Sequence, residues 1–145
     1  MHCISTTRIA ESVRAILGLV YVGGAFAHLA FWATNRDMYA EITPHVQFEW
    51  YRDLWTGVVL PNVGVLLPLL ALFEALVAVA ILSNERVARA GLLAGAAFNV
   101  AIAPLGFWWP ANVALAAIHL TLVPVTYRET TVGRMRSRLA SARAR

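Results

Sequence analysis

The sequence predicts an all-α integral membrane protein, a four-helix bundle of up-down-up-down topology with both termini in the cytoplasm. Hydrophobic residues make up 59% of the 145 residues and charged residues only 14%, whereas a soluble domain has about 25% charged residues. Four apolar stretches reach the roughly 17–25 residues that a helix needs to cross the hydrocarbon core. The arginines between these stretches then predict the topology.

The four predicted spans belong to a single membrane domain comprising residues 1–145. Their approximate bounds are 15–33, 58–82, 90–107 and 111–127, and a basic tail follows at 128–145. We expect helices because lipid cannot hydrogen-bond an exposed backbone amide. A cleaved signal peptide is the alternative for the first stretch, since Ala25-Phe26-Ala27 is a small-x-small sequence. The apolar run is, however, longer than the usual 7–15 residues or so.

The predicted orientation follows from arginine, which accounts for all 12 basic residues. Arg8 and Arg14 precede span one, Arg86 and Arg89 lie between spans two and three, and six more arginines follow span four. On the opposite side, acidic residues outnumber basic ones in the loop Asn35–Gly57. The positive-inside rule therefore places both termini in the cytoplasm.

The loop Asn35–Gly57 is rich in aromatic residues, which is typical of a membrane–water interface. Four of its apolar residues and the first residue after it recur at helical spacing: Phe48, Tyr51, Leu54, Trp55 and Val58. This spacing predicts a short helix that lies on the membrane or leads into span two. Two roles are open for this aromatic loop: it anchors the protein at the membrane interface, or it covers a pocket.

The expected partners are membrane lipids, because the basic tail would be attracted to anionic headgroups. The small residues Gly23 and Gly24 in span one, and Gly91-x-x-x-Gly95 in span three, predict close helix packing. The same small residues leave open, as further partners, another membrane protein or a second copy of this chain. We expect no nucleic-acid partner, since no binding module or stacking aromatic accompanies the arginines. The lone Cys3 excludes an internal disulfide.

Each predicted span contains a strongly polar residue, which is costly in lipid and tends to face the bundle interior. Tyr21 and Asn112 precede two of them by seven residues, about two helical turns, and so share a helix face with them. In such a bundle spans one and four are neighbours, so His28 and His119, at similar depth, are expected to face each other. The candidate ligand-binding residues are His28, His119, Asn99, Glu74, Asn112 and Tyr21.

Four interpretations of this polar set are open. The residues fix the bundle by interhelical hydrogen bonds, or they orient the polar head of a small apolar molecule such as a quinone or another lipid. Alternatively, His28 and His119 hold haem b as axial ligands, or Glu74 and the histidines transfer protons. No hydrolase, phosphate-binding, HExxH or dinucleotide motif occurs. No catalytic residue and no metal site is therefore predicted.

Two segments, residues 17–28 and 69–76, together with the arginine loop at 86–89 and the small-residue span three, resemble the DoxX-like family of small four-helix membrane proteins. The resemblance implies a bacterial inner membrane. It also implies a link to redox work, because relatives include the membrane subunit of a thiosulfate:quinone oxidoreductase and partners of oxidative-stress enzymes. Glu74 matches the acidic residue of the family's second span. The chain departs from the family in having no cysteine pair and a long aromatic loop, which weakens a thiol-based mechanism.

These observations favour an accessory or ligand-holding membrane protein with a polar intramembrane cleft, open to the outer side, for a quinone or lipid. One alternative is a membrane subunit of an oxidoreductase that passes electrons through quinone or haem. Another is a pure scaffold for a second membrane protein, in which the face of Gly91 and Gly95 would matter and the histidines would not.

Overall fold

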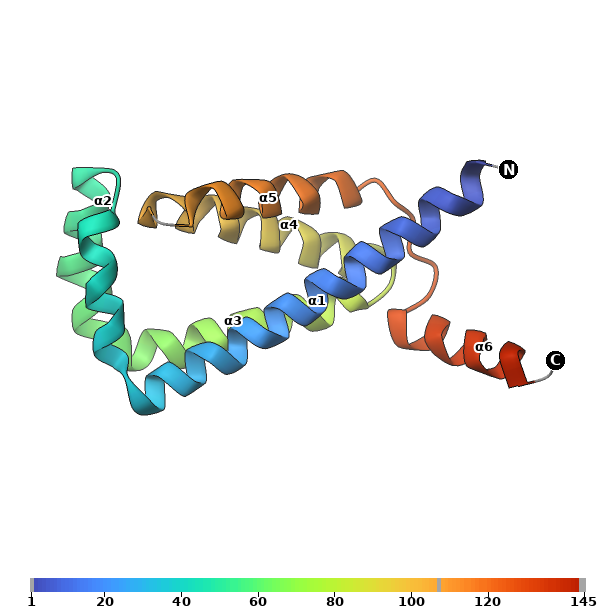
Figure 1. Cartoon of the computed structure of the whole chain (residues 1–145), viewed down its shortest axis with the longest axis horizontal. Helices are drawn as coiled ribbons and strands as arrows, with labels where there is room; N and C mark the ends of the chain where they lie inside the picture. Colours follow the sequence, from blue (N-terminus) through green and yellow to red (C-terminus); the bar gives the residue numbers. More distant parts are fainter. Residues whose placement is uncertain (1, 107, 144–145) are drawn as a thin grey trace.

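The computed structural model describes residues 2–106 and 108–143, and every regular element in those ranges is helical (Figure 1). The four longest helices that pack together are α1 (His2–Thr34), α3 (Val63–Leu82), α4 (Glu85–Ile102) and α5 (Trp109–Leu122). Two shorter helices are α2 (Glu49–Leu54) and α6 (Thr131–Arg143). Short 3₁₀ or π-helical segments complete the chain: η1 (Arg36–His45), η2 (Trp55–Val59), η3 (Leu60–Asn62) and η4 (Ala103–Leu105).

Among the described residues, three helical stretches are long and apolar enough to cross a membrane: Arg8–Thr34, Glu49–Leu82 and Glu85–Leu105. The fourth apolar helix, α5, has only 14 residues. It ends at Leu122 rather than near Tyr127 as predicted, and Pro124, which has no backbone N–H to continue the helical hydrogen bonds, lies two residues further on. The second stretch begins earlier than predicted, since α2, η2 and η3 lead into α3 as one helical run.

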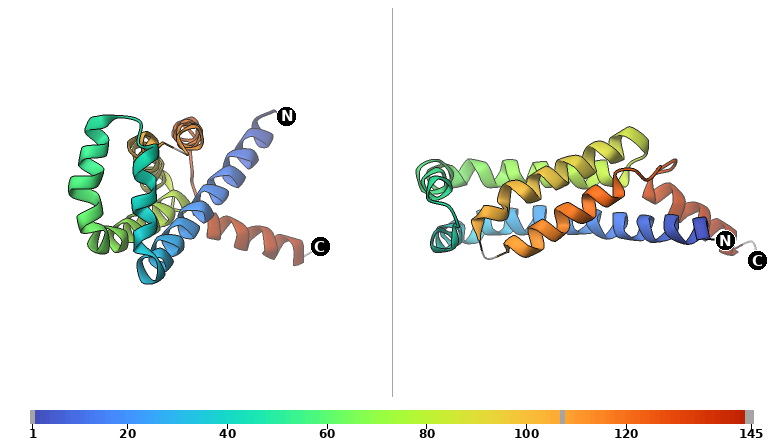
Figure 2. Two further views of the ribbon diagram at one scale, coloured as in Figure 1. Left: turned by 60° about the vertical axis from the view of Figure 1, so that its left-hand side comes forward. Right: turned by 90° about the horizontal axis from the view of Figure 1, so that it is seen from above.

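The helices form two pairs that diverge toward one end of the molecule. α1 packs along α3, α3 contacts α4, and α4 packs along α5. The two pairs separate toward the end at which η1 and α2 lie, here called the loop end, and both chain termini lie at the other end (Figures 1 and 2). The expected pairing of spans one and four is not a packed helix pair; α1 and α5 meet through the side chains of Tyr21 and His119.

α3 separates its residues into two faces. The buried face carries Leu67, Ala71, Glu74, Ala78 and Ile81. The opposite face carries Val65, Leu69, Leu72, Leu76 and Val79, each more than half exposed. Both sets alternate spacings of four and three residues, which is the period of one helix face. An apolar face exposed along a whole helix is expected where lipid tails are the neighbours, and the only charged residue of α3 lies on the other face.

The crossing of α3 and α4 depends on Gly91. A Cβ atom placed on this glycine would lie 2.6 Å from the backbone nitrogen of Ile81 and 2.7 Å from the Cβ of Ala80. Backbone atoms cannot move aside as a flexible side chain can. The close packing predicted from the small residues of span three is therefore used, at Gly91, within this chain.

Arg14 joins three parts of the chain at the end of the molecule that holds both termini. Its side chain is fully buried and donates hydrogen bonds to the backbone oxygen of Ser83 (2.7 Å) and to Oγ1 of Thr131 (2.9 Å). It also pairs with the Glu11 carboxylate at 2.9 Å. Because Ser83 follows α3 and Thr131 begins α6, one guanidinium group holds α1, α3 and α6 together.

Two further side chains complete this cluster. Arg134 of α6 lies 3.2 Å from Glu11, and the ring of Tyr127 lies 4.2 Å from the Arg14 guanidinium carbon. The segment predicted only as a basic tail thus contains a helix, and one of its arginines is bound to α1.

We expect Gly91→Ala to destabilise the fold by about 1–3 kcal/mol, the usual cost of an added methyl group in a tight contact. The midpoint of thermal unfolding in detergent, followed by circular dichroism, measures this loss. Gly23→Ala is the matched control, because a Cβ at Gly23 meets nothing within 4 Å. Equal midpoints for the two variants would contradict the close crossing.

We expect Arg14→Met to cost about 3 kcal/mol, since removing one partner of a buried ion pair leaves the other charge poorly compensated. Arg8→Gln, which removes an exposed arginine from the same helix, should have little effect. The double variant Glu11→Gln/Arg14→Met should recover part of the loss in the same unfolding measurement. A double variant less stable than Arg14→Met would argue against the pairing.

Candidate functional site

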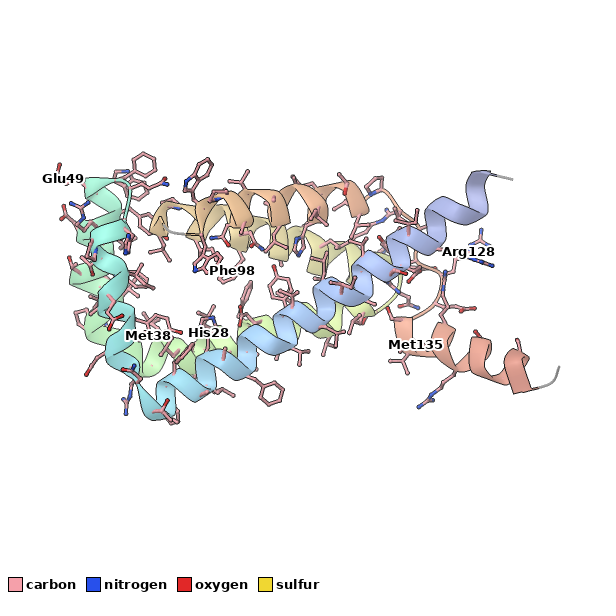
Figure 3. The ribbon with its side chains drawn as sticks, in the orientation of Figure 1. His28, Met38, Glu49, Phe98, Arg128 and Met135 are labelled. Carbon is pink, nitrogen blue, oxygen red and sulfur yellow. The ribbon has the colours of Figure 1, made fainter. Side chains whose placement is uncertain are left out.

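A large cavity of about 640 Å³ lies at the loop end, between the diverging helix pairs. Its wall is mostly apolar and includes Met38, Leu54, Trp55, Leu70 and Phe98. Figure 3 shows Phe98 of α4 and His28 of α1 pointing toward each other across the space between the pairs. The main polar groups on the wall are His28, Tyr39, Glu41, His45 and Asn112. An apolar cavity with a few polar groups is typical of a small-molecule site.

The aromatic loop builds one side of this cavity. Tyr39, Val46, Trp55 and Leu67 form a buried cluster that packs η1 and η2 against the start of α3. The backbone nitrogen of Gln47 donates to the oxygen of Pro104 at 3.0 Å, which ties the loop to η4. The loop therefore covers the cavity, which was one of its two predicted roles.

A second tie is made by Tyr51, whose hydroxyl donates to the backbone oxygen of Ala101 at 2.8 Å. Other aromatic side chains of this end stay on the surface: Trp50 and Trp108 are 64% and 68% exposed. Such positions suit the anchoring role. Different residues of the loop end thus cover the cavity and face outward.

His28 lies where the cavity wall meets the helix interior. Its Nδ1 shares a hydrogen bond with the Tyr39 hydroxyl, and its Nε2 lies 3.6 Å from Oε2 of Glu74. Burial is the main cause that raises the pKa of Tyr39 to about 12. His28 therefore connects a neutral phenol of the loop with the carboxyl group of α3.

A small cavity of about 150 Å³ lies deeper in the bundle. Its polar lining comes from four helices: Tyr21, Glu74, Asn99, Asn112 and His119. Asn99 donates from Nδ2 to the Tyr21 hydroxyl at 2.9 Å and to the backbone oxygen of Gly95 at 2.8 Å. The rings of Tyr21 and His119 are nearly perpendicular, with centroids 5.6 Å apart. Five of the six candidate polar residues thus line one small cavity.

The tautomer of His119 follows from its contacts. Nδ1 lies 2.6 Å from the backbone oxygen of Leu115. A carbonyl oxygen can only accept, so Nδ1 carries the hydrogen. In the neutral ring Nε2 then has a free lone pair, and this nitrogen is buried without a hydrogen-bond partner among the described residues.

Two glycines make room for these polar side chains. A Cβ on Gly24 would lie 2.8 Å from both carboxylate oxygens of Glu74. A Cβ on Gly95 would lie 2.5 Å from Nε2 of His119 and 2.7 Å from the Tyr21 hydroxyl. The small residues that predicted helix packing therefore also belong to the candidate site, which sequence reasoning did not detect.

The six predicted residues are close together but divided between the two cavities. Tyr21, Glu74, Asn99 and His119 line the small cavity, His28 lines the large one, and Asn112 lines both. His28 and His119 do not share a cavity. Sequence reasoning missed Tyr39, Glu41, His45 and Phe98, although the aromatic and acidic content of the loop was a usable signal.

Haem held by two axial histidines does not fit this geometry. Both ring nitrogens of His28 already face Tyr39 and Glu74, and Nε2 of His119 lies against Gly95. No group of three or more metal-ligating His, Cys, Asp or Glu side chains occurs in the described part of the chain.

The fold and the two cavities define, over the described residues, an all-helical protein whose apolar helices surround a small polar cavity. The chain matches no protein-family model, no curated protein and no solved structure. Its functional assignment therefore depends on the geometry of the cavities.

We expect Tyr39 to ionise near pH 12, whereas an exposed tyrosine ionises near pH 10. The pKa of Tyr39 is higher in the folded than in the unfolded protein. The contribution of the neutral phenol to the free energy of unfolding is therefore fully present below about pH 10 and is lost as the pH rises through the folded-state pKa. Ultraviolet titration of the protein and of Tyr39→Phe isolates this tyrosine as a difference. A difference spectrum that titrates near pH 10 in the folded protein would show that Tyr39 is not buried, and the same titration in denaturant is the control.

Proposed function

We propose that the chain is a multi-pass membrane protein that holds a small lipid-soluble molecule with a polar head, such as a quinone or a lipid. The observation that carries this proposal is the large cavity, which is apolar except for a few polar groups. Its volume of about 640 Å³ lies within the range of roughly 300–1,000 Å³ found for ligand pockets. His28 and Asn112 are placed to orient the head of such a molecule.

A neighbouring apolar cavity supports a ligand with a tail. This cavity, of about 400 Å³, shares Tyr39, Trp55, Leu70 and Phe98 with the large cavity and continues along α3. It reaches Leu69, which is 53% exposed. A chain that extends from the large cavity would therefore pass along apolar walls toward the lipid-facing surface of α3.

The proposed topology has four crossings, with α5 as the shortest, and both termini in the cytoplasm of a bacterial cell. At ~1.5 Å per residue the 14 residues of α5 span roughly 21 Å, so the segments on either side complete the crossing. The termini lie at one end with most of the arginines, and the acidic loop lies at the other (Figure 1). Placement in the inner membrane rests on the resemblance to the DoxX-like family.

A holding role is favoured over a pure scaffold by the positions of the glycines. A scaffold would present Gly91 and Gly95 to a partner helix. Instead Gly91 faces Ile81, and Gly95 faces His119 and Tyr21, all within this chain. The small residues of span three are thus already in use.

The test fills the cavity with a side chain. In nanodiscs of phosphatidylethanolamine and phosphatidylglycerol, we expect the protein to bind decylubiquinone or to retain a specific lipid, detected by mass spectrometry. Leu70→Trp should lower retention by about tenfold, which corresponds to about 1.4 kcal/mol, because Leu70 lines the large cavity.

Leu72→Trp is the matched control, since Leu72 lies on the exposed face of the same helix. His28→Leu should weaken binding of the quinone and also lower the thermal midpoint, because it removes the partner of Glu74, so its retention is measured at a temperature at which the variant is folded. Retention that is equal in Leu70→Trp, His28→Leu and the unsubstituted protein would show that the large cavity is not the binding site.

A further inference from the structure

Two buried polar atoms at the small cavity make no hydrogen bond within the described residues, and one of them, Oε2 of Glu74, lies 3.6 Å from Nε2 of His28. Oε2 of Glu74 and Nε2 of His119 lack hydrogen bonds among the described residues, and both residues line the small cavity. Glu74 is 6% exposed and His119 is fully buried. Buried polar atoms are nearly always hydrogen-bonded to protein or to water. We therefore infer that these two atoms form hydrogen bonds with water in the small cavity.

The size and lining of the cavity suit water. Its volume is about 150 Å³, and a water molecule takes roughly 30 Å³ in the liquid, so several molecules fit. The hydroxyl of Tyr21 and the amide of Asn112 add further polar groups on the wall. An apolar cavity of this size would stay dry, whereas one with several polar partners holds water.

The charges around Glu74 decide what this water can do. From α1 it faces His28 and Tyr21, from η1 Tyr39, and from α5 His119, while α4 contributes the uncharged Asn99. No arginine lines the small cavity among the described residues. The nearest group able to carry a positive charge beside the carboxylate is therefore the His28 imidazole, 3.6 Å away.

We propose that Glu74, on the wall of the hydrated small cavity, and His28, on the wall of the large cavity, share one exchangeable proton. With this proton the pair is either a neutral carboxyl group beside neutral imidazole or a carboxylate beside imidazolium, and both states have no net charge. Without the proton, an unpaired carboxylate would remain among apolar helices, which is costly. Water in the cavity exchanges protons with the pair.

The pair also connects the two cavities, and this step rests on the proposed function. A proton moves from the Glu74 carboxyl group to Nε2 of His28, which leaves a carboxylate beside an imidazolium, and it returns by the same path. Nδ1 of His28 shares a hydrogen bond with the Tyr39 hydroxyl at the large cavity. The position of the shared proton therefore changes the charge of the ring that faces a molecule bound in the large cavity, and a ligand with a hydrogen-bond acceptor in its head would sense it.

Infrared spectroscopy of the ligand-free protein in nanodiscs at neutral pH tests the shared proton. We expect either the carbonyl stretch of a protonated carboxyl group or the bands of a histidine cation, lost in Glu74→Gln. The signal should shift when the sample is moved to D₂O, because water reaches the pair. An ionised carboxylate beside a neutral His28, or a signal that does not respond to D₂O, would overturn the proposal.

Two glycine variants, Gly24→Ala and Gly23→Ala, provide a second test in case Glu74→Gln does not fold. Gly24→Ala places a methyl group 2.8 Å from the Glu74 carboxylate and should shift the infrared signal, whereas Gly23→Ala, with nothing within 4 Å, should not. Equal spectra in these two variants would also overturn the proposal. Since no ligand is added, this outcome is independent of the quinone measurement, and either result can fail without the other.

Discussion

The contact between the Glu74 carboxyl group and α1 fixes how the largest helices fit together. The carboxylate lies against Gly24 and 3.6 Å from His28, one helical turn further along α1. An unpaired polar group in lipid surroundings costs several kcal/mol, so α1 cannot slide along α3 without losing this partner. Through His28 the same contact reaches Tyr39 and holds η1 at the loop end.

The large cavity follows from how the two helix pairs are joined. In a closed four-helix bundle, side chains from every helix fill the centre. Here α1 and α5 are not packed together, and the pairs diverge toward the loop end. That end is covered by η1 and α2, which are tied to α4 and η4 by hydrogen bonds from Tyr51 and Gln47. A loop that covers the space without filling it leaves room for a ligand.

Local sequence features predicted the helices well, and long-range contacts limited the rest. Hydropathy located the apolar helices because a window of neighbouring residues contains that information. Arg14 was interpreted only as an orientation signal, since its partners Ser83 and Thr131 are far away in sequence. The helix α6 was missed because its sequence is polar and rich in arginine and so has no apolar periodicity that predicts a helix. The expected contact of His28 with His119 depended on an assumed pairing of spans one and four.

The candidate site shows why small residues are hard to interpret from sequence. The cost of burying polar groups drew attention to Glu74 and His119, and both line the small cavity. The glycines that accommodate them resembled ordinary packing motifs. What distinguishes these glycines is the group opposite: Gly91 faces the backbone of Ile81, while Gly95 faces an imidazole nitrogen. One Gly-x-x-x-Gly motif therefore contains both a helix crossing and a wall of the polar cavity, and only the residues across from it separate the two roles.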